Sequence, residues 1–260
     1  YGDEYDACPV NTCEAGLWVS YQSLVTPPAQ GVGDNYRVRY IAPLERHIHH
    51  HGGYGRPFPP KYKDILADRG STSGELGFHG KRQNNMDIVL VPLAGAEYPD
   101  QGLKNNSVPL LKNVDAKASL VALEEAARRH ETMLGAFSSL GYDTPGYGYG
   151  EKDEEGTPVL SKGIAAIANK YNIPYIMDNA WGIPFIGTSI KKVGADIMIY
   201  SMDKATGSAT SGLIIGKEDV MVNVRRALGM HGQRYGATNS YGKAALVTQD
   251  PGKEGLTGQL

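Results

Sequence analysis

Two charged residues, Asp178 and Lys204, each follow a short apolar run in the sequence. Asp178 ends the run 173–178, and Lys204 lies just beyond the run 196–200. The two are separated by 204 − 178 = 26 residues, which leaves room for one short crossover between parallel strands. Because ligands bind at the carboxyl ends of parallel strands, we expect both side chains at one edge of one sheet, facing one pocket.

This pair of side chains suits a specific chemistry. A desolvated lysine amine forms a Schiff base with an aldehyde, and an aspartate keeps a pyridine nitrogen protonated, so that the ring becomes an electron sink. Pyridoxal 5'-phosphate needs both groups, and its phosphate needs N–H donors such as those at a helix N-terminus. Asn11, Thr12 and Cys13 stand where a helix is expected to begin. Ser201, three residues before Lys204, adds a hydroxyl.

Alternating apolar and amphipathic segments predict the elements that position these residues. Strands are predicted over residues 37–42, 87–93, 174–177, 196–200 and 213–215. Helices are predicted over residues 14–24, 116–130 (with Asp115 as N-cap), 162–171 and 220–228, and residues 8–12 read as a turn-rich lead-in. This alternation predicts an α/β fold, a three-layer sandwich with a mostly parallel central sheet.

Four motifs in this order resemble the fold-type I pyridoxal-phosphate enzymes, the aspartate-aminotransferase-like superfamily. The resemblance covers nearly all of the chain and implies a PLP-transferase-like large domain. A Gly-rich strand at 207–216 follows the last motif, as in the family. The matching segments are Asn11-Thr-Cys-Glu-Ala15, the strand 37–42 followed by His47, His49, His50 and His51, Asp178-Asn179-Ala180, and Ser201-Met-Asp-Lys204.

The resemblance implies roles for individual residues. Lys204 would carry the cofactor as a Schiff base and move a proton once displaced, and Asp178 would pair with the pyridine nitrogen. A histidine would stack on the ring, with His51 the first choice, and Arg234 would bind the substrate. The cofactor-binding set is Asn11, Thr12, Cys13, His49, Asp178, Ala180, Ser201 and Lys204. Of these, Thr12, Cys13 and Ser201 would hold the phosphate.

The segment Asp178-Asn179-Ala180-Trp181-Gly182 is most similar to the selenocysteine-synthase and cysteine-desulfurase-like branch. That likeness implies a lyase or transferase that performs β-elimination or replacement on an amino acid. A decarboxylase and an aminotransferase are the alternatives within the family. The resemblance also implies a homodimer or a higher homo-oligomer.

Plainer roles compete with these. Lys204 alone could be a surface lysine, Asp178 a helix cap and Thr12 an ordinary N-cap. Arg225 and Arg226 could bind a carboxylate or phosphate bidentately, although a solvated helix face is the preferred interpretation for both. The histidines suggest a metal site, but adjacent strand residues point to opposite faces, and no carboxylate or thiol has ligand spacing nearby; we expect no metal.

Two alternatives come from other classes. Tyr200 and Lys204 match the Tyr-x-x-x-Lys of NAD(P)-dependent short-chain dehydrogenases, yet the N-terminal region has no Gly-rich dinucleotide turn. The one Gly-x-Gly-x-Gly, at 146–150, lies in mid-chain. The other alternative is a catalytically inactive scaffold of the same fold.

Composition limits the remaining possibilities. Lys and Arg number 26 against 28 Asp and Glu, a net charge of −2, so a nucleic-acid partner is not expected. Two cysteines do not form a disulfide framework, and no apolar run reaches the roughly 18 residues that span a bilayer. With no secretory leader visible, we expect a cytoplasmic protein. We expect a cofactor-binding domain over 1–245, largely without the family's N-terminal segment, and a truncated C-terminal segment over 246–260.

Overall fold

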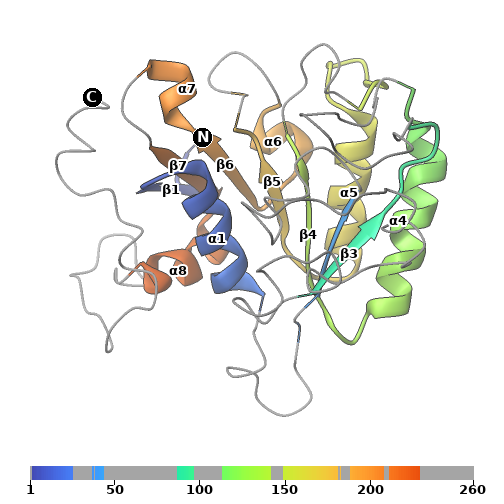
Figure 1. Ribbon diagram of the computed structural model, residues 1–260, viewed down its shortest axis with the longest axis horizontal. Helices are drawn as coiled ribbons and strands as arrows, with labels where there is room; N and C mark the ends of the chain where they lie inside the picture. Colours follow the sequence, from blue (N-terminus) through green and yellow to red (C-terminus); the bar gives the residue numbers. More distant parts are fainter. Residues whose placement is uncertain are drawn as a thin grey trace, which may run out of the picture.

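A single mixed sheet forms the centre of the molecule. The computed structural model describes residues 2–25, 37, 39–43, 87–96, 113–141, 149–180, 182, 188–207 and 211–228. Within these residues the sheet has seven strands in the order β1-β7-β6-β5-β4-β2-β3 (Figure 1). The strands are β1 (Tyr5–Val10), β2 (Arg39–Pro43), β3 (Asp87–Val91), β4 (Leu134–Leu140), β5 (Tyr175–Asp178), β6 (Ile197–Ser201) and β7 (Gly212–Lys217).

Strand direction decides which chain segments meet at one edge of the sheet. Strands β3, β2, β4, β5 and β6 are mutually parallel, whereas β7 is antiparallel to both β6 and β1. The carboxyl ends of β1, β5 and β6 therefore lie at the same edge as the amino end of β7. The register shows this directly, because Gly212 is opposite Ser201 on one side and Val10 on the other.

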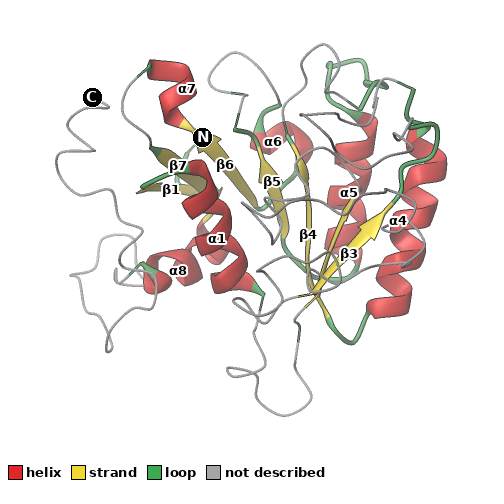
Figure 2. Cartoon of the chain, viewed as in Figure 1, coloured by secondary structure: helices red, strands yellow, loops and turns green. Residues whose placement is uncertain are grey.

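Helices cover both faces of the sheet (Figure 2). Helices α1 (Cys13–Leu24) and α8 (Glu218–Ala227) pack on one face, in one buried apolar cluster. On the other face α4 (Ala116–His130), α5 (Val159–Lys170) and the short α6 (Ile190–Val193) form a second cluster. A short helix, α7 (Met202–Thr206), follows β6 directly. These three layers confirm the predicted α/β sandwich with a mostly parallel sheet.

Strand β6 shows why the sequence adopts this arrangement. Ile197 and Ile199 belong to the cluster under α1 and α8, whereas Met198 and Tyr200 belong to the cluster under α4 and α5. A strand that is buried on both faces reads as a continuous apolar run, which is how this segment appears in the sequence.

Most predicted elements are confirmed, with ends that differ by a few residues. The Asp115 cap is also confirmed, since its carboxylate accepts the Ala118 N–H at 2.9 Å. The turn-rich lead-in was wrong: Cys8 and Pro9 belong to β1, where a proline is tolerated because β1 is an edge strand. The sequence reading also missed β4, α6 and α7.

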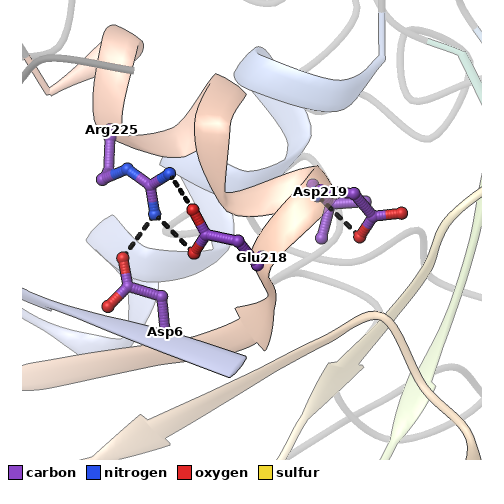
Figure 3. A network of polar contacts seen from close by, with 5 residues as sticks. Asp6, Glu218, Asp219 and Arg225 are labelled. Carbon is purple, nitrogen blue, oxygen red and sulfur yellow. Dashed lines mark hydrogen bonds and ion pairs between the residues drawn. The ribbon is translucent and has the colours of Figure 1, made fainter. Parts of the chain in front are cut away.

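Arg225 is a second correction. It was expected on a solvated helix face, yet its side chain is only 2% exposed. Its guanidinium forms a bidentate pair with Glu218, at 2.6 and 3.1 Å, and also bonds to Asp6 (Figure 3). This network ties α8 to β1, while Arg226 is exposed as expected.

No helix among the described residues is both long and apolar enough to cross a membrane.

Candidate active site

The first turn of α1 begins immediately after β1 ends. Thr12 has an extended backbone (φ −150°, ψ 166°), and its hydroxyl oxygen accepts the Ala15 N–H at 2.8 Å. Glu14 puts a negative charge in the first turn, which complements the helix dipole. Thr12 is therefore the N-cap of α1. This is the plainer of the two roles that the sequence suggested for it, the other being phosphate binding.

Strand β7 fixes the position of this helix end. A Cβ atom at Gly212 would lie 2.3 Å from the Thr12 carbonyl oxygen and 2.8 Å from the Cys13 nitrogen. Both neighbours are backbone atoms, which cannot move aside as a flexible side chain can. The absence of a side chain at Gly212 thus lets the start of α1 rest on the start of β7.

Asp178 is fully buried at the carboxyl end of β5. Its Oδ1 accepts the Ala180 N–H at 3.0 Å and lies 3.8 Å from the Cys13 Sγ, which donates to it. The alternative role as a helix cap is not observed, because no helix begins between Asp178 and Ala180. The sheet thus brings the end of β5 to the start of α1, 165 residues away along the chain.

Cys13 is the residue that links Asp178 and Lys204. Burial raises the pKa of the Cys13 thiol well above its usual value, and the negative charges of Asp178 and Glu14 raise it further. The positive charge of Lys204 acts on the same thiol in the opposite direction and lowers its pKa. Asp178 and Lys204, 26 residues apart in sequence, therefore both act electrostatically on one buried thiol.

Lys204 lies in α7 and is exposed, so the desolvated environment expected of its amine is not observed. Its exposure agrees with the plainer interpretation of Lys204 as a surface lysine. Ser201, at the end of β6, is 5% exposed, and its hydroxyl donates to the Asp203 carboxylate at 2.5 Å. Of the other residues expected at the site, Ala180 is buried beside Asp178 and Asn11 is half-buried just before α1. These side chains all come from the edge where β1, β5 and β6 end.

Two buried polar atoms at this edge were not anticipated. Within the described part of the chain, Asn179 Oδ1 and Ser211 Oγ have no hydrogen-bond partner. The Asn179 amide nitrogen donates to Met198 Sδ at 3.2 Å, and the Ser211 carbonyl accepts the Met202 N–H at 3.0 Å. Buried polar atoms are normally paired, so both are available to a bound polar group or water. Ser211 lies in the Gly-rich segment 207–216, and only the glycines of this segment entered the sequence prediction.

A pair of buried hydroxyl groups connects α1 to β4. The Tyr21 hydroxyl is hydrogen-bonded to the Ser138 hydroxyl of β4, and the Tyr21 ring stacks on Tyr40 of β2 with centroids 4.5 Å apart. One feature of the sequence is consistent with this pair: Tyr21 follows Cys13 by eight residues, which puts both on one face of α1.

The remaining expected residues fall in two groups. His47, His49, His50, His51 and Arg234 lie outside the described residues. Tyr200 is buried in β6 and its hydroxyl contacts Met198 Sδ at 2.9 Å. Since Lys204 is in α7, Tyr200 and Lys204 do not share a helix face, and the geometry does not favour the dehydrogenase alternative. Among the residues with described positions, no cluster of His, Cys, Asp and Glu could hold a metal ion.

Comparison with known proteins identifies the fold. No protein-family model and no curated protein sequence matches the chain. Among solved structures, a D-glucosaminate-6-phosphate ammonia-lyase is similar over 98% of this chain and 51% of its own, with 17% identity and a TM-score of 0.54.

Two further solved structures are similar over 84% of this chain. A complex of SepCysS with the SepCysE N-terminal domain has 13% identity, a TM-score of 0.48 and 43% of its chain covered. A ureidoglycine-glyoxylate aminotransferase from Bacillus subtilis has 12% identity, a TM-score of 0.47 and 41% covered. The chain thus spans about half the length of the structures it resembles or somewhat less. With its seven-stranded sheet and the ammonia-lyase likeness, the chain has a PLP-transferase-like α/β fold.

Proposed function

We propose that this chain carries the cofactor site of a pyridoxal-phosphate-dependent enzyme that acts on amino acids. The observation that carries the proposal is that Asp178 and Lys204 both act on Cys13 in the first turn of α1. The Cys13 thiol contacts the buried carboxylate of Asp178, and the positive charge of Lys204 lowers the pKa of the same thiol. When bound, the cofactor supplies an aldehyde that links to an amine and a ring that accepts electrons from the substrate.

The residues present fit this cofactor. A carboxylate for the ring nitrogen, an amine for the aldehyde and a helix N-terminus for the phosphate are the donor set it requires, and all three occur at one sheet edge. In addition, the orphaned Asn179 Oδ1 and Ser211 Oγ offer polar atoms to a bound group. Lys204 would hold the cofactor covalently, and the phosphate would bind at Thr12, Ser201 and the first-turn amides of α1, beside Asn11 and Ala180.

The protein residues divide the work by burial and exposure. Asp178 has no exposed surface, so its carboxylate would interact strongly with a positive charge at the ring nitrogen and would hold a proton there. Lys204 is exposed at the edge, and in this proposal its amine would move the proton at the substrate carbon. In the same proposal, His51 or His49 would stack on the ring, and Arg234 would bind the substrate carboxylate.

For the reaction, we favour β-elimination or replacement by a lyase or transferase. The Asp178-Asn179-Ala180-Trp181-Gly182 segment and the likeness to an ammonia-lyase support this choice. Decarboxylation and transamination are the alternatives within the class. The proposal includes a homodimer or larger homo-oligomer in the cytoplasm, and a cofactor domain over 1–245 followed by a separate segment over 246–260.

The test uses the purified full chain with added pyridoxal phosphate. We expect a Schiff-base absorption band that borohydride abolishes, with the cofactor mass then fixed on the peptide that contains Lys204. Lys204→Ala should abolish this labelling. Lys117→Ala, at an exposed position of α4 on the other side of the sheet, should leave it unchanged.

A protein that takes up no cofactor at Lys204 would contradict the proposal and would favour the alternative of a catalytically inactive scaffold. If labelling succeeds, product analysis with an amino-acid panel separates the reactions. Release of an α-keto acid without an added acceptor identifies elimination, release of CO2 identifies decarboxylation, and a requirement for a second keto acid identifies transamination.

A further inference from the structure

Cys13 was expected to bind the cofactor phosphate, but its side chain lies against a different group. Its Sγ is 3.8 Å from Asp178 Oδ1, and the two side chains are 4% and 0% exposed. Burial and the nearby carboxylates raise the pKa of this thiol, so it stays protonated at neutral pH and can donate. The contact is therefore an S–H hydrogen bond to a buried carboxylate.

Two donors from different parts of the fold converge on the same oxygen. The Ala180 N–H comes from the turn after β5, and the Cys13 thiol comes from the first turn of α1. The terminal torsion of an aspartate is intrinsically broad, so the direction of its carboxylate is set by its neighbours. Gly212 lets the backbone of Thr12 and Cys13 lie close against β7, and the Cys13 side chain is buried there.

We propose that Cys13 is a positioning residue that orients the Asp178 carboxylate toward the cofactor ring nitrogen by donating its thiol hydrogen to Oδ1. This inference rests on the proposed function. It leaves the phosphate to Thr12, Ser201 and the amides of α1. The relevant property of Cys13 is hydrogen-bond donation. Serine at this position should therefore preserve the function of Cys13, whereas alanine should not.

The first experiment needs no cofactor. The S–H stretching band in the infrared reports the strength of the hydrogen bond that a thiol donates. The chain has two cysteines, Cys8 and Cys13, so in the Cys8→Ala variant the S–H band comes from Cys13. In that background Asp178→Asn should shift the band toward the position of a weaker hydrogen bond. Asp219→Asn, an exposed aspartate on α8, should not move it.

The second experiment measures cofactor binding and the pH dependence of the bound cofactor's absorption spectrum. Cys13→Ala should weaken cofactor binding about threefold to tenfold, the range of one net hydrogen bond, and should shift the spectral pH profile. Cys13→Ser should recover most of both properties. Cys8→Ala, which changes a buried thiol of β1 outside the site, should match the unmodified protein in both.

Each outcome has a definite meaning. A Cys13 band that ignores Asp178→Asn overturns the inference, and so does a Cys13→Ala protein with unchanged cofactor affinity and spectrum. Equal defects in Cys13→Ser and Cys13→Ala reduce Cys13 to a packing residue and also overturn it. If the band responds but no variant, nor the unmodified chain, binds the cofactor, the hydrogen bond stands and the proposed function is what fails.

Discussion

The Gly212 Cα faces the Thr12 carbonyl so closely that a Cβ atom there would lie 2.3 Å from its oxygen. This contact joins the amino end of β7 to the N-cap of α1. Because Cys13 follows Thr12 and contacts Asp178, the same contact determines how far α1 stands from the end of β5. A glycine in the sheet thus controls the spacing of the candidate site.

Gly212→Ala should therefore damage both stability and the site. The added methyl group meets backbone atoms of Thr12 and Cys13, so α1 must shift, at a cost of about 1–3 kcal/mol as for other overpacked positions. Denaturant unfolding gives the free energy of unfolding, and cofactor titration gives the affinity. Gly163→Ala is the comparison, since the three atoms nearest to its Cβ would all belong to the side chain of Leu120 rather than to backbone. Equal stability losses in the two variants would contradict the argument.

The buried arginine gives a second prediction, for stability alone. Arg225→Ala removes the partner of two partly buried carboxylates, Asp6 and Glu218. Breaking a buried ion pair costs roughly 3–5 kcal/mol, and the partial exposure of both acids lowers the expected loss to about 2–3 kcal/mol. Arg226→Ala, one residue along the same helix and exposed, should change the free energy of unfolding by less than about 0.5 kcal/mol.

Chemical denaturation with far-UV circular dichroism measures both arginine variants. The cofactor affinity of Arg225→Ala should stay within about twofold of the original under native conditions, because the network joins α8 to Asp6 at the start of β1, the end of the strand opposite the candidate site. An Arg225→Ala protein as stable as Arg226→Ala would show that the network contributes nothing.

The sequence was sufficient for the elements with a clear apolar period. Strand β6 is continuous apolar sequence, and α4 has both its Asp115 cap and regular buried positions, so both were predicted nearly to the residue. Strand β4 was missed because its sequence, LGAFSSL, contains small and polar residues. Its serines are tolerated in the core because Tyr21 and Tyr175, from other elements, hydrogen-bond to them. That compensation depends on tertiary contacts, which no local pattern reveals.

The same division applies to the site. The positions of Asp178 and Lys204 after apolar runs were predicted because strand ends are a local feature, and the structure has Asp178 at the end of β5 and Lys204 in α7, just after β6. The contact between Cys13 and Asp178 was not, because it depends on how α1 sits on β7. Arg225 was misassigned for a related reason: its partner Asp6 belongs to β1, a strand that the sequence pattern did not show.

The raised pKa of the Cys13 thiol leads to a prediction about its reactivity. Since the thiolate is the nucleophile, a raised pKa lowers its fraction at a given pH and slows alkylation. In a Cys8→Ala background, Asp178→Asn removes a charge that raises the pKa, so iodoacetamide labelling should become faster. Lys204→Ala removes a charge that lowers it, so labelling should become slower.

Mass spectrometry of timed samples at several pH values gives the labelling rates. Plotted against pH, the Asp178→Asn curve should lie on the acidic side of the parent curve and the Lys204→Ala curve on the alkaline side. Glu14→Gln should resemble Asp178→Asn in direction, because Glu14 also raises the Cys13 pKa. Identical curves for all four proteins would mean that local unfolding, and not electrostatics, limits the reaction.

The hydroxyl pair beneath the site gives the last prediction. Tyr21→Phe and Ser138→Ala each remove one side of a buried hydrogen bond between α1 and β4, and each should lower the free energy of unfolding by about 1–3 kcal/mol. The double variant should lose less free energy of unfolding than the sum of the two single losses. In each single variant one buried hydroxyl is left without its partner, whereas in the double variant both hydroxyls are absent. Four unfolding curves complete the cycle. Strict additivity would show that the two hydroxyl groups do not interact, and would remove the link through which we expect α1 to be held on the sheet face that carries Asp178.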